Sequence, residues 1–261
     1  MALNRREFLS LVAAGVATGL LVSSPLARAA TRPKIKAIAF DGFTTFDPRP
    51  VFALTEALFP GHGAELSNAW RTRQFEYAWL RTLTGRYLDF WHVTEDALVF
   101  SAKMLKLELS PEKRRQLMHA YLEIKAWPDA LPALRSLKDA GIRMAFLSNL
   151  TAAMLDAAVK NSGLDDIFEP HLSTDRVRAY KPDPRAYQMG IDAFGLRRDQ
   201  IAFAAFGGWD AAGAKSFGYP TFWVNRMNLP VEELGVAPDA IGASLHELKN
   251  LPPPQNLWVL I

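Results

Sequence analysis

The sequence contains no cysteine, and this absence excludes several kinds of chemistry at once. Neither a thiolate nucleophile nor a zinc site with thiolate ligands can be built from it. Disulfides are excluded too, so the fold of this 261-residue chain must be stabilised by its apolar core. Apolar residues make up 49% of the chain, which is enough for one large domain or for a core with a smaller insert.

The net charge of the chain is also small. The formal charge is +3 at pH 7, and the Lys and Arg residues are scattered rather than gathered in runs. Nucleic-acid-binding domains usually carry a strongly basic patch or stripe. We therefore predict no nucleic-acid partner.

The first thirty residues have the features of a cleaved leader. Arg5 and Arg6 precede an apolar stretch over 11–22, and Ala27-Arg28-Ala29 supplies small residues at a cleavage site. The apolar stretch is shorter than the ~20 residues that span a membrane. We predict a twin-arginine signal peptide over residues 1–29, cleavage after Ala29, and a periplasmic mature protein without a membrane anchor.

Short apolar segments alternate with helical segments along most of the chain. Strands are expected over 34–40, 142–150, 168–174, 201–208 and 220–226. Strands that alternate with helices favour a parallel sheet covered on both faces. We predict an α/β fold with a doubly wound parallel-sheet (Rossmann-like) core. Its parts are a core over 34–50 and 126–250, an inserted helical cap over 51–125, and a tail over 251–261.

Polar side chains follow four of the expected strands. Asp41 follows the first, Ser148-Asn149 the second and Asp210 the fourth, while Lys181 lies in the loop after the third. Taken singly, such residues are usually helix caps, turns or solvated charges. Because ligands of open α/β sheets bind beyond the carboxyl ends of the strands, the four together predict an active site.

These motifs resemble the haloacid dehalogenase superfamily, and within it the type II L-2-haloacid dehalogenase group. The resemblance covers nearly all of residues 34–248. It includes the long cap segment "LFPGHGAELSNAWRTRQFEYAWLRTLTGRYLDFW" together with "LSN", "YKPDPRAY" and "WDAAGAKSFG".

The resemblance implies a covalent mechanism. Asp41 takes the place of the nucleophile, which forms an ester that water then hydrolyses. Lys181 would keep Asp41 ionised, and Asp210 would hold Lys181 or orient the water. Ser148, with nearby backbone N–H groups, suits a substrate carboxylate, and Arg71 matches the cap arginine that closes over the substrate.

Further positions match the substrate-binding residues of the group. Phe43, Phe90, Tyr187 and Trp209 match the apolar wall, although each could equally be an ordinary core aromatic. Asn149 follows Ser148, and Thr44 is assigned the role of a family threonine because "DGFTTFD" is one residue shorter than the usual opening. The resemblance implies no cofactor and no metal, and leaves a homodimer open.

A phosphatase of the same superfamily is the less favoured reading. Family phosphatases carry an acid two residues after the nucleophile, where this chain has Phe43. Phosphoryl transfer without that acid and with a depleted magnesium site is unattractive.

The sequence departs from the dehalogenase pattern at the end of the fourth strand. The group has Ser and Asn there, and this chain has Ala205-Phe206-Gly207-Gly208. Because this change affects the halide cradle, and because the chain has a leader, we prefer L-azetidine-2-carboxylate, opened at C2 to 4-amino-2-hydroxybutyrate. The alternative substrate is an (S)-2-haloacid. A catalytically silent periplasmic binding protein is a third reading.

Overall fold

The computed structural model describes residues 34–169 and 171–252. The predicted signal peptide and all but the first two residues of the predicted tail lie outside these ranges. Within them, no helix is both long enough and apolar enough to cross a membrane.

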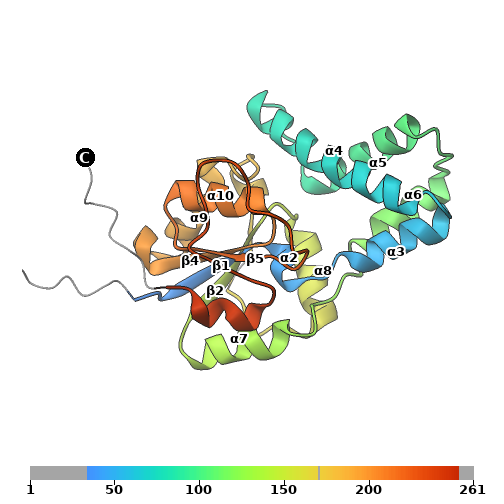
Figure 1. The fold of residues 1–261 in the computed structure, drawn as a ribbon. Helices are drawn as coiled ribbons and strands as arrows, with labels where there is room; N and C mark the ends of the chain where they lie inside the picture. The colour runs from blue at the N-terminus through green and yellow to red at the C-terminus, as the bar shows by residue number, and fades with distance from the viewer. Residues whose placement is uncertain (1–33, 170, 253–261) are drawn as a thin grey trace, which may run out of the picture. The chain divides into compact units, whose positions relative to one another are not determined.

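A parallel sheet of six strands forms the centre of the described chain (Figure 1). Its spatial order is β3-β2-β1-β4-β5-β6. The strands are β1 (Ala37–Phe40), β2 (Arg143–Ser148), β3 (Leu172–Ser173), β4 (Ile201–Ala205), β5 (Thr221–Val224) and β6 (Ala240–Gly242). The predicted α/β fold is confirmed. Strand β6 was not predicted, because three residues at a sheet edge give no apolar run.

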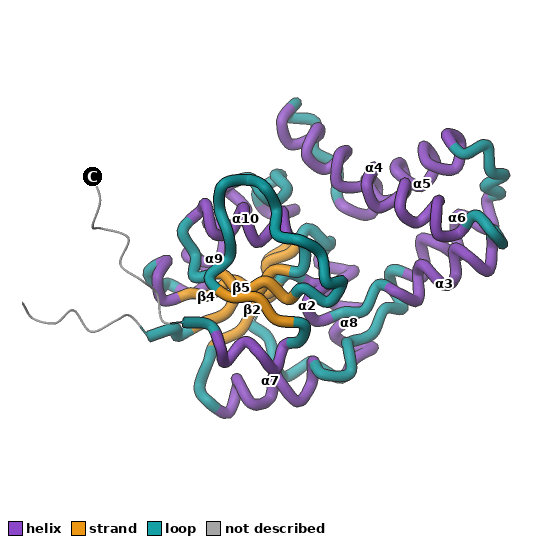
Figure 2. The backbone as a smooth tube through the Cα atoms, in the orientation of Figure 1, coloured by secondary structure: helices purple, strands orange, loops and turns teal. Residues whose placement is uncertain are grey.

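Helices cover both faces of the sheet (Figure 2). They are α7 (Ala130–Asp139), α8 (Ala152–Ser162), α9 (Pro184–Phe194) and α10 (Gly208–Phe217). Alternate residues of β1 enter different cores: Ile38 and Phe40 pack with α7 and α8, whereas Ala37 and Ala39 pack with α9 and α10. This period of two is what a strand buried on both faces requires.

Four helices lie between the single turn α2 (Gly42–Thr45), which follows β1, and helix α7. They are α3 (Arg49–Leu58), α4 (Gly63–Leu83), α5 (Phe90–Met104) and α6 (Pro111–Ala120). Helix α6 begins with a common capping pattern, since Ser110 accepts a hydrogen bond from the Lys113 N–H and Pro111 takes the first helical position. This is the inserted helical region; the predicted boundaries at residues 51 and 125 stay predictions.

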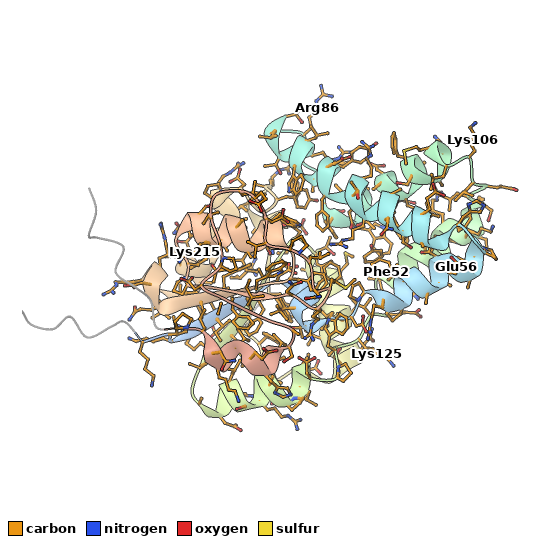
Figure 3. All side chains as sticks on the ribbon, viewed as in Figure 1. Phe52, Glu56, Arg86, Lys106, Lys125 and Lys215 are labelled. Atoms are coloured by element: carbon orange, nitrogen blue, oxygen red, sulfur yellow. The ribbon has the colours of Figure 1, made fainter. Side chains whose placement is uncertain are left out.

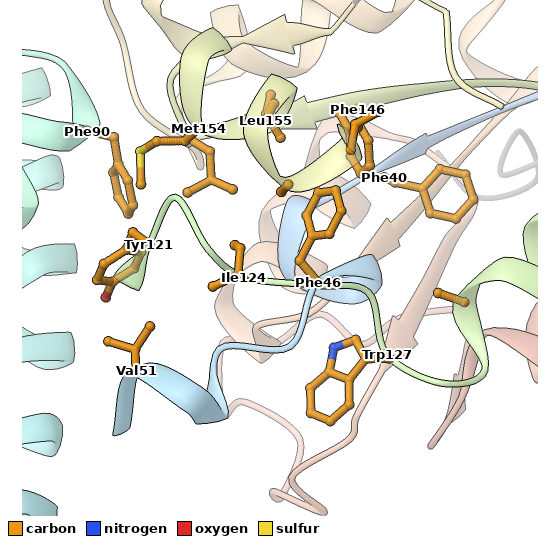
Figure 4. Packing of buried hydrophobic residues seen from close by; sticks show 14 of the residues in the cluster. Phe40, Phe46, Val51, Phe90, Tyr121, Ile124, Trp127, Phe146, Met154 and Leu155 are labelled. Atoms are coloured by element: carbon orange, nitrogen blue, oxygen red, sulfur yellow. The ribbon is translucent and has the colours of Figure 1, made fainter. Parts of the chain in front are cut away.

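The apolar core continues from the sheet into the inserted helices. Phe40 and Phe146 belong to the same buried cluster as Val51, Phe90 and Tyr121, and Figure 4 shows these side chains along one continuous region. The cap and the sheet therefore share a core, which holds the cap side chains over the carboxyl ends of the strands.

Candidate active site

Three of the predicted site residues meet at the carboxyl ends of adjacent strands. Asp41 follows β1, Ser148 ends β2, and Asp210 lies in the first turn of α10, directly after β4. Because β1 lies between β2 and β4, Asp41 is at the centre of this edge. The strand order thus brings these three side chains together, and their roles in a reaction stay predictions.

Lys181 connects the two carboxylates. Its Nζ donates hydrogen bonds to Oδ1 of Asp41 at 2.7 Å and to Oδ2 of Asp210 at 2.6 Å, and its side chain is completely buried. Burial alone would lower the pKa of Lys181, but the charges of Asp210 and Asp41 outweigh it and raise the pKa. Lys181 is therefore a fixed cation at the floor of the site.

Asp210 has both carboxylate oxygens engaged. Oδ2 accepts from Lys181, and Oδ1 accepts from the Tyr187 hydroxyl at 2.8 Å. Burial raises the pKa of Asp210 to about 6, against the opposing effect of the Lys181 charge. Of the two roles predicted for Asp210, this geometry favours holding Lys181 over orienting water.

The remaining oxygen of Asp41 is held by the backbone. Its Oδ2 accepts from the Phe43 N–H at 3.1 Å, so Asp41 caps the turn α2. The Thr44 hydroxyl donates to the Asp41 carbonyl at 2.6 Å and does not line the cavity described below. Asp41 is 8% exposed and Asp210 is 1% exposed, so Asp41 is the more open of the two carboxylates.

Ser148 and Asn149 flank Asp41 on the β2 side. The Asn149 Oδ1 accepts from the Lys181 backbone N–H at 3.1 Å, which fixes the loop that delivers Lys181. Ser148 Oγ accepts from the Leu150 N–H at 3.2 Å and keeps its own O–H for another partner. A Cβ on Gly42 would lie 3.0 Å from Ser148 Oγ and 2.8 Å from Leu150 Cδ1, so a larger residue at 42 would make these side chains shift.

A cavity opens above Asp41, between the strand ends and the cap. Its space for water-sized molecules is about 50 Å³, which suits a ligand of a few heavy atoms. Of the predicted site residues, it is lined by Asp41, Phe43, Arg71, Phe90, Ser148, Asn149, Trp209 and Asp210. Lys181 and Tyr187 do not line the cavity. Lys181 donates hydrogen bonds to both carboxylates and Tyr187 donates one to Asp210, so Tyr187 is not part of the predicted apolar lining.

Arg71 is the cap residue best placed to meet an anion. It lies on α4 and lines the cavity, and within residues 34–169 and 171–252 its side chain has no ion pair or hydrogen bond. The wall also contains Phe52 of α3, labelled in Figure 3. Arg49 also lines the cavity, but its guanidinium pairs with Asp47 at 2.7 Å. The guanidinium of Arg71, unpaired in the described part of the chain, is therefore the suitable receptor for a small carboxylate or for a departing anion.

The sequence analysis missed two neighbours of Arg71. Gln74 and Phe75 also line the cavity. They follow Arg71 by three and four residues, a spacing that places side chains on the same face of a helix. That periodicity was the signal that could have identified them.

Trp209 links the site to the cap. Its ring packs against Phe75 and Trp79 of α4 at centroid distances of 5.0 and 5.5 Å. Trp79 in turn donates its indole N–H to the Lys181 carbonyl at 3.2 Å. A Cβ on Gly207 would lie 2.8 Å from Nε1 of Trp209, so the missing side chain at 207 is what gives the indole its place.

No group of three or more His, Asp or Glu side chains among the described residues could hold a metal ion. That the protein works without a cofactor stays a prediction.

The chain is similar to proteins of known function. A family model described as haloacid dehalogenase-like hydrolase matches residues 13–218. An (S)-2-haloacid dehalogenase from Pseudomonas sp. (strain YL) is 43% identical over 218 residues, which cover 83% of this chain and 94% of that protein. The haloacetate dehalogenase H-2 of Moraxella sp. (strain B) is 42% identical, over 79% of this chain and 92% of that one.

A solved structure is similar as well. The L-2-haloacid dehalogenase of Xanthobacter autotrophicus with chloropropionic acid covalently bound is 34% identical, with a TM-score of 0.77. The match covers 83% of this chain and 98% of that chain.

Proposed function

The chain belongs to the family of haloacid dehalogenase-like hydrolases, and on that premise we propose that it hydrolyses the carbon–halogen bond of small (S)-2-haloacids through an ester of Asp41. The observation that carries the proposal is the buried Lys181, which holds Asp41 at 2.7 Å on the floor of a small apolar cavity. A carboxylate held in place and partly desolvated can act as a nucleophile, and an apolar wall suits a carbon–halogen bond.

The first step is a displacement at C2. Oδ2 of Asp41, which has only the neutral Phe43 N–H as a donor in the described chain, attacks C2 from the side opposite the halogen. The new C–O bond forms as the C–halogen bond breaks, and the halide leaves with the bonding electrons. Arg71, on the cap side, receives the halide or the substrate carboxylate.

The second step returns the enzyme. Water adds to the carboxyl carbon of the ester, the ester C–O bond breaks, and a 2-hydroxy acid leaves while Asp41 is restored. One water is consumed, and one halide and one proton are released. Ser148, with an O–H still free to donate, and the backbone amides beside it hold the substrate carboxylate through both steps.

The leaving group proposed here is a halide, whereas the sequence analysis preferred the ring amine of L-azetidine-2-carboxylate. The two dehalogenases of 42% and 43% identity support a halide, and no comparison supports the azetidine ring. The departure at Ala205 and Gly207 is real, but Trp209 occupies part of the space at Gly207, so the cavity wall remains closed there.

The leaving group is tested by incubating the mature protein with (S)-2-chloropropionate and, separately, with L-azetidine-2-carboxylate, in both cases with EDTA. We expect chloride and lactate from the first and no 4-amino-2-hydroxybutyrate from the second. Ring opening without chloride release would reverse the assignment. Activity that needs magnesium would favour a phosphatase, and binding without turnover a silent binding protein.

The ester is tested by isotope. A single turnover in heavy-oxygen water, with enzyme in excess, puts unlabelled oxygen from Asp41 into the first product and leaves the label on the Asp41 carboxylate. Direct attack by water would label the product and leave Asp41 unlabelled.

We also propose that the protein is exported to the periplasm. The support is the paired Arg5-Arg6, the apolar stretch and the Ala27-Arg28-Ala29 box of the sequence.

A further inference from the structure

The helical turn that follows the nucleophile is too short to be stable without contacts from the rest of the protein. Helix α2 spans only Gly42–Thr45, and a single helical turn is unfavourable in isolation. At its start, Asp41 accepts from the Phe43 and Thr44 N–H groups. The orientation of the Asp41 carboxylate therefore depends on the contacts that hold the rest of this turn in place.

The backbone carbonyls of the last three residues of the turn accept hydrogen bonds from residues distant in the sequence. The Phe43 carbonyl accepts from the Trp127 indole N–H at 3.1 Å, and the Thr45 carbonyl accepts from the Trp127 backbone N–H at 2.9 Å. The Thr44 carbonyl accepts from Nη2 of Arg226 at 2.9 Å. Figure 4 shows Trp127 beside Phe46, the residue that follows the turn.

Arg226 is itself firmly held. Its Nη1 and Nη2 each lie 3.0 Å from an oxygen of Asp129, and its side chain is only 7% exposed. The guanidinium also covers the face of Trp127 at 4.6 Å from the ring centroid. Asp129 is anchored in turn by the Leu245 N–H at 2.8 Å. The remaining donor of Arg226, Nε, is buried without an acceptor among the described residues.

We infer that Arg226 is a positioning residue for Asp41. By bonding the Thr44 carbonyl and covering Trp127, it fixes the turn whose Phe43 N–H holds Oδ2 of the nucleophile. The kinetic part of this inference rests on the proposed function. The next residue, Met227, lines the cavity, so the segment that fixes the turn also closes one wall of the site.

The chain offers a control with the same kinds of contact in Arg143, whose side chain is more exposed, at 43% against 7% for Arg226. It makes a forked pair with Glu169 at 2.6 and 2.8 Å, donates to the Phe194 carbonyl at 2.7 Å, and covers the Phe194 ring at 5.1 Å. These are the same three kinds of contact that Arg226 makes. Arg143 is the first residue of β2, and Ser148 is the last, so Arg143 lies at the end of the strand away from the site.

The experiment compares Arg226→Gln with Arg143→Gln in two measurements. The first is the single-turnover rate of ester formation from (S)-2-chloropropionate, together with KM. For Arg226→Gln we expect the rate to fall about tenfold or more with KM changed less than about twofold, because misalignment of the nucleophile affects the reaction more than binding. Arg143→Gln should leave the rate of ester formation and KM unchanged, even if it lowers Tm by as much as Arg226→Gln does.

The second measurement does not need turnover. Hydrogen–deuterium exchange of the amides of residues 43–46 should become about tenfold faster in Arg226→Gln, because a charge-assisted hydrogen bond to the turn is lost. Arg143→Gln should leave it unchanged. Arg226→Lys, which keeps the charge but cannot form the fork, should give intermediate values in both measurements.

The outcomes separate the two proposals. Exchange over 43–46 that is unchanged in Arg226→Gln overturns the positioning role, whether or not the protein releases halide. A rise in KM with an unchanged rate of ester formation overturns it too, since Arg226 would then act in binding. A wild-type protein that releases no chloride contradicts the proposed function alone, and the exchange result still decides the role of Arg226.

Discussion

The ammonium of Lys181 lies 2.7 Å from Oδ1 of Asp41, and the lysine side chain is completely buried. A buried cation is costly unless opposite charges compensate it. Here Asp41 and Asp210 raise the pKa of Lys181 above its ordinary value, so the ammonium persists. The same contact holds the Asp41 carboxylate in place beside a fixed positive charge.

Replacement of Lys181 by methionine should abolish most of the activity. Two facing carboxylates would lose the positive charge between them, so their mutual repulsion would displace Asp41. We expect ester formation to fall at least about a thousandfold, which corresponds to ~4 kcal/mol of transition-state stabilisation. The free energy of unfolding should fall by about 3–5 kcal/mol, as when one partner of a buried ion pair is removed. Single-turnover kinetics and urea titration measure the two effects.

Lys215→Met is the matched control. Lys215 pairs with Asp239 at 2.6 Å, is about 22% exposed, and is labelled in Figure 3 well apart from Phe52 of the cavity wall. This variant should lose some stability and keep the rate of ester formation. Equal losses of rate in the two variants would remove Lys181 from its proposed role.

Much of the site could be predicted because of one property of parallel sheets. Asp41, Ser148 and Asp210 follow strands that were recognisable as apolar runs, and the carboxyl ends of such strands meet at one edge. No contact information was needed for this step.

The support around the nucleophile could not be predicted in the same way. Trp127 and Arg226 bond backbone carbonyls of α2 from positions about 80 and 180 residues away, and a backbone acceptor leaves no residue-type signal at its own position. Strand β6 was missed for a similar reason, since its pairing with β5 and not its composition makes it a strand.

Arg71→Lys tests the cap. Lysine keeps the charge but loses the planar fork that grips a carboxylate at two points. We expect kcat/KM for (S)-2-chloropropionate to fall at least about tenfold, or ~1.4 kcal/mol. Steady-state kinetics on the mature protein measure it.

Arg73→Lys is the control on the same helix. Arg73 pairs with Glu76 at 2.9 Å, covers the Phe100 ring at 4.1 Å, and does not line the cavity. Its replacement should leave kcat/KM unchanged. If Arg71→Lys behaves the same way, Arg71 is only a charge on the cap surface.

Export can be tested on the protein made by its own host. The leader predicts a mature N-terminus at or near Ala30, and Arg5→Lys combined with Arg6→Lys should prevent export, because the twin-arginine route reads the arginine pair. N-terminal sequencing of periplasmic and cytoplasmic fractions measures both. A full-length protein that begins at Met1 or Ala2 and stays in the cytoplasm would contradict the proposal.

The pH dependence should report on Asp210. Burial raises the pKa of this carboxyl to about 6, so kcat/KM should have an acid limb with a midpoint near pH 6, below which Lys181 loses one of its two anchors. The effect on stability has the opposite sign. The folded state binds the Asp210 proton more tightly than the unfolded state, so this group contributes stability below its ordinary pKa of 3.8, and that contribution is lost as the pH rises through about 6.

Tyr187→Phe moves this limb in a direction fixed by the geometry. The Tyr187 hydroxyl donates to Oδ1 of Asp210 at 2.8 Å, and a donor stabilises the charged form of a carboxyl. Without it, the pKa of Asp210 should rise further, so the acid limb of kcat/KM should shift to higher pH while the plateau is largely retained. In Asp210→Asn the limb should disappear along with most of the activity. An acid limb that stays at the same pH in Tyr187→Phe would assign it to another group and separate Asp210 from the observed titration.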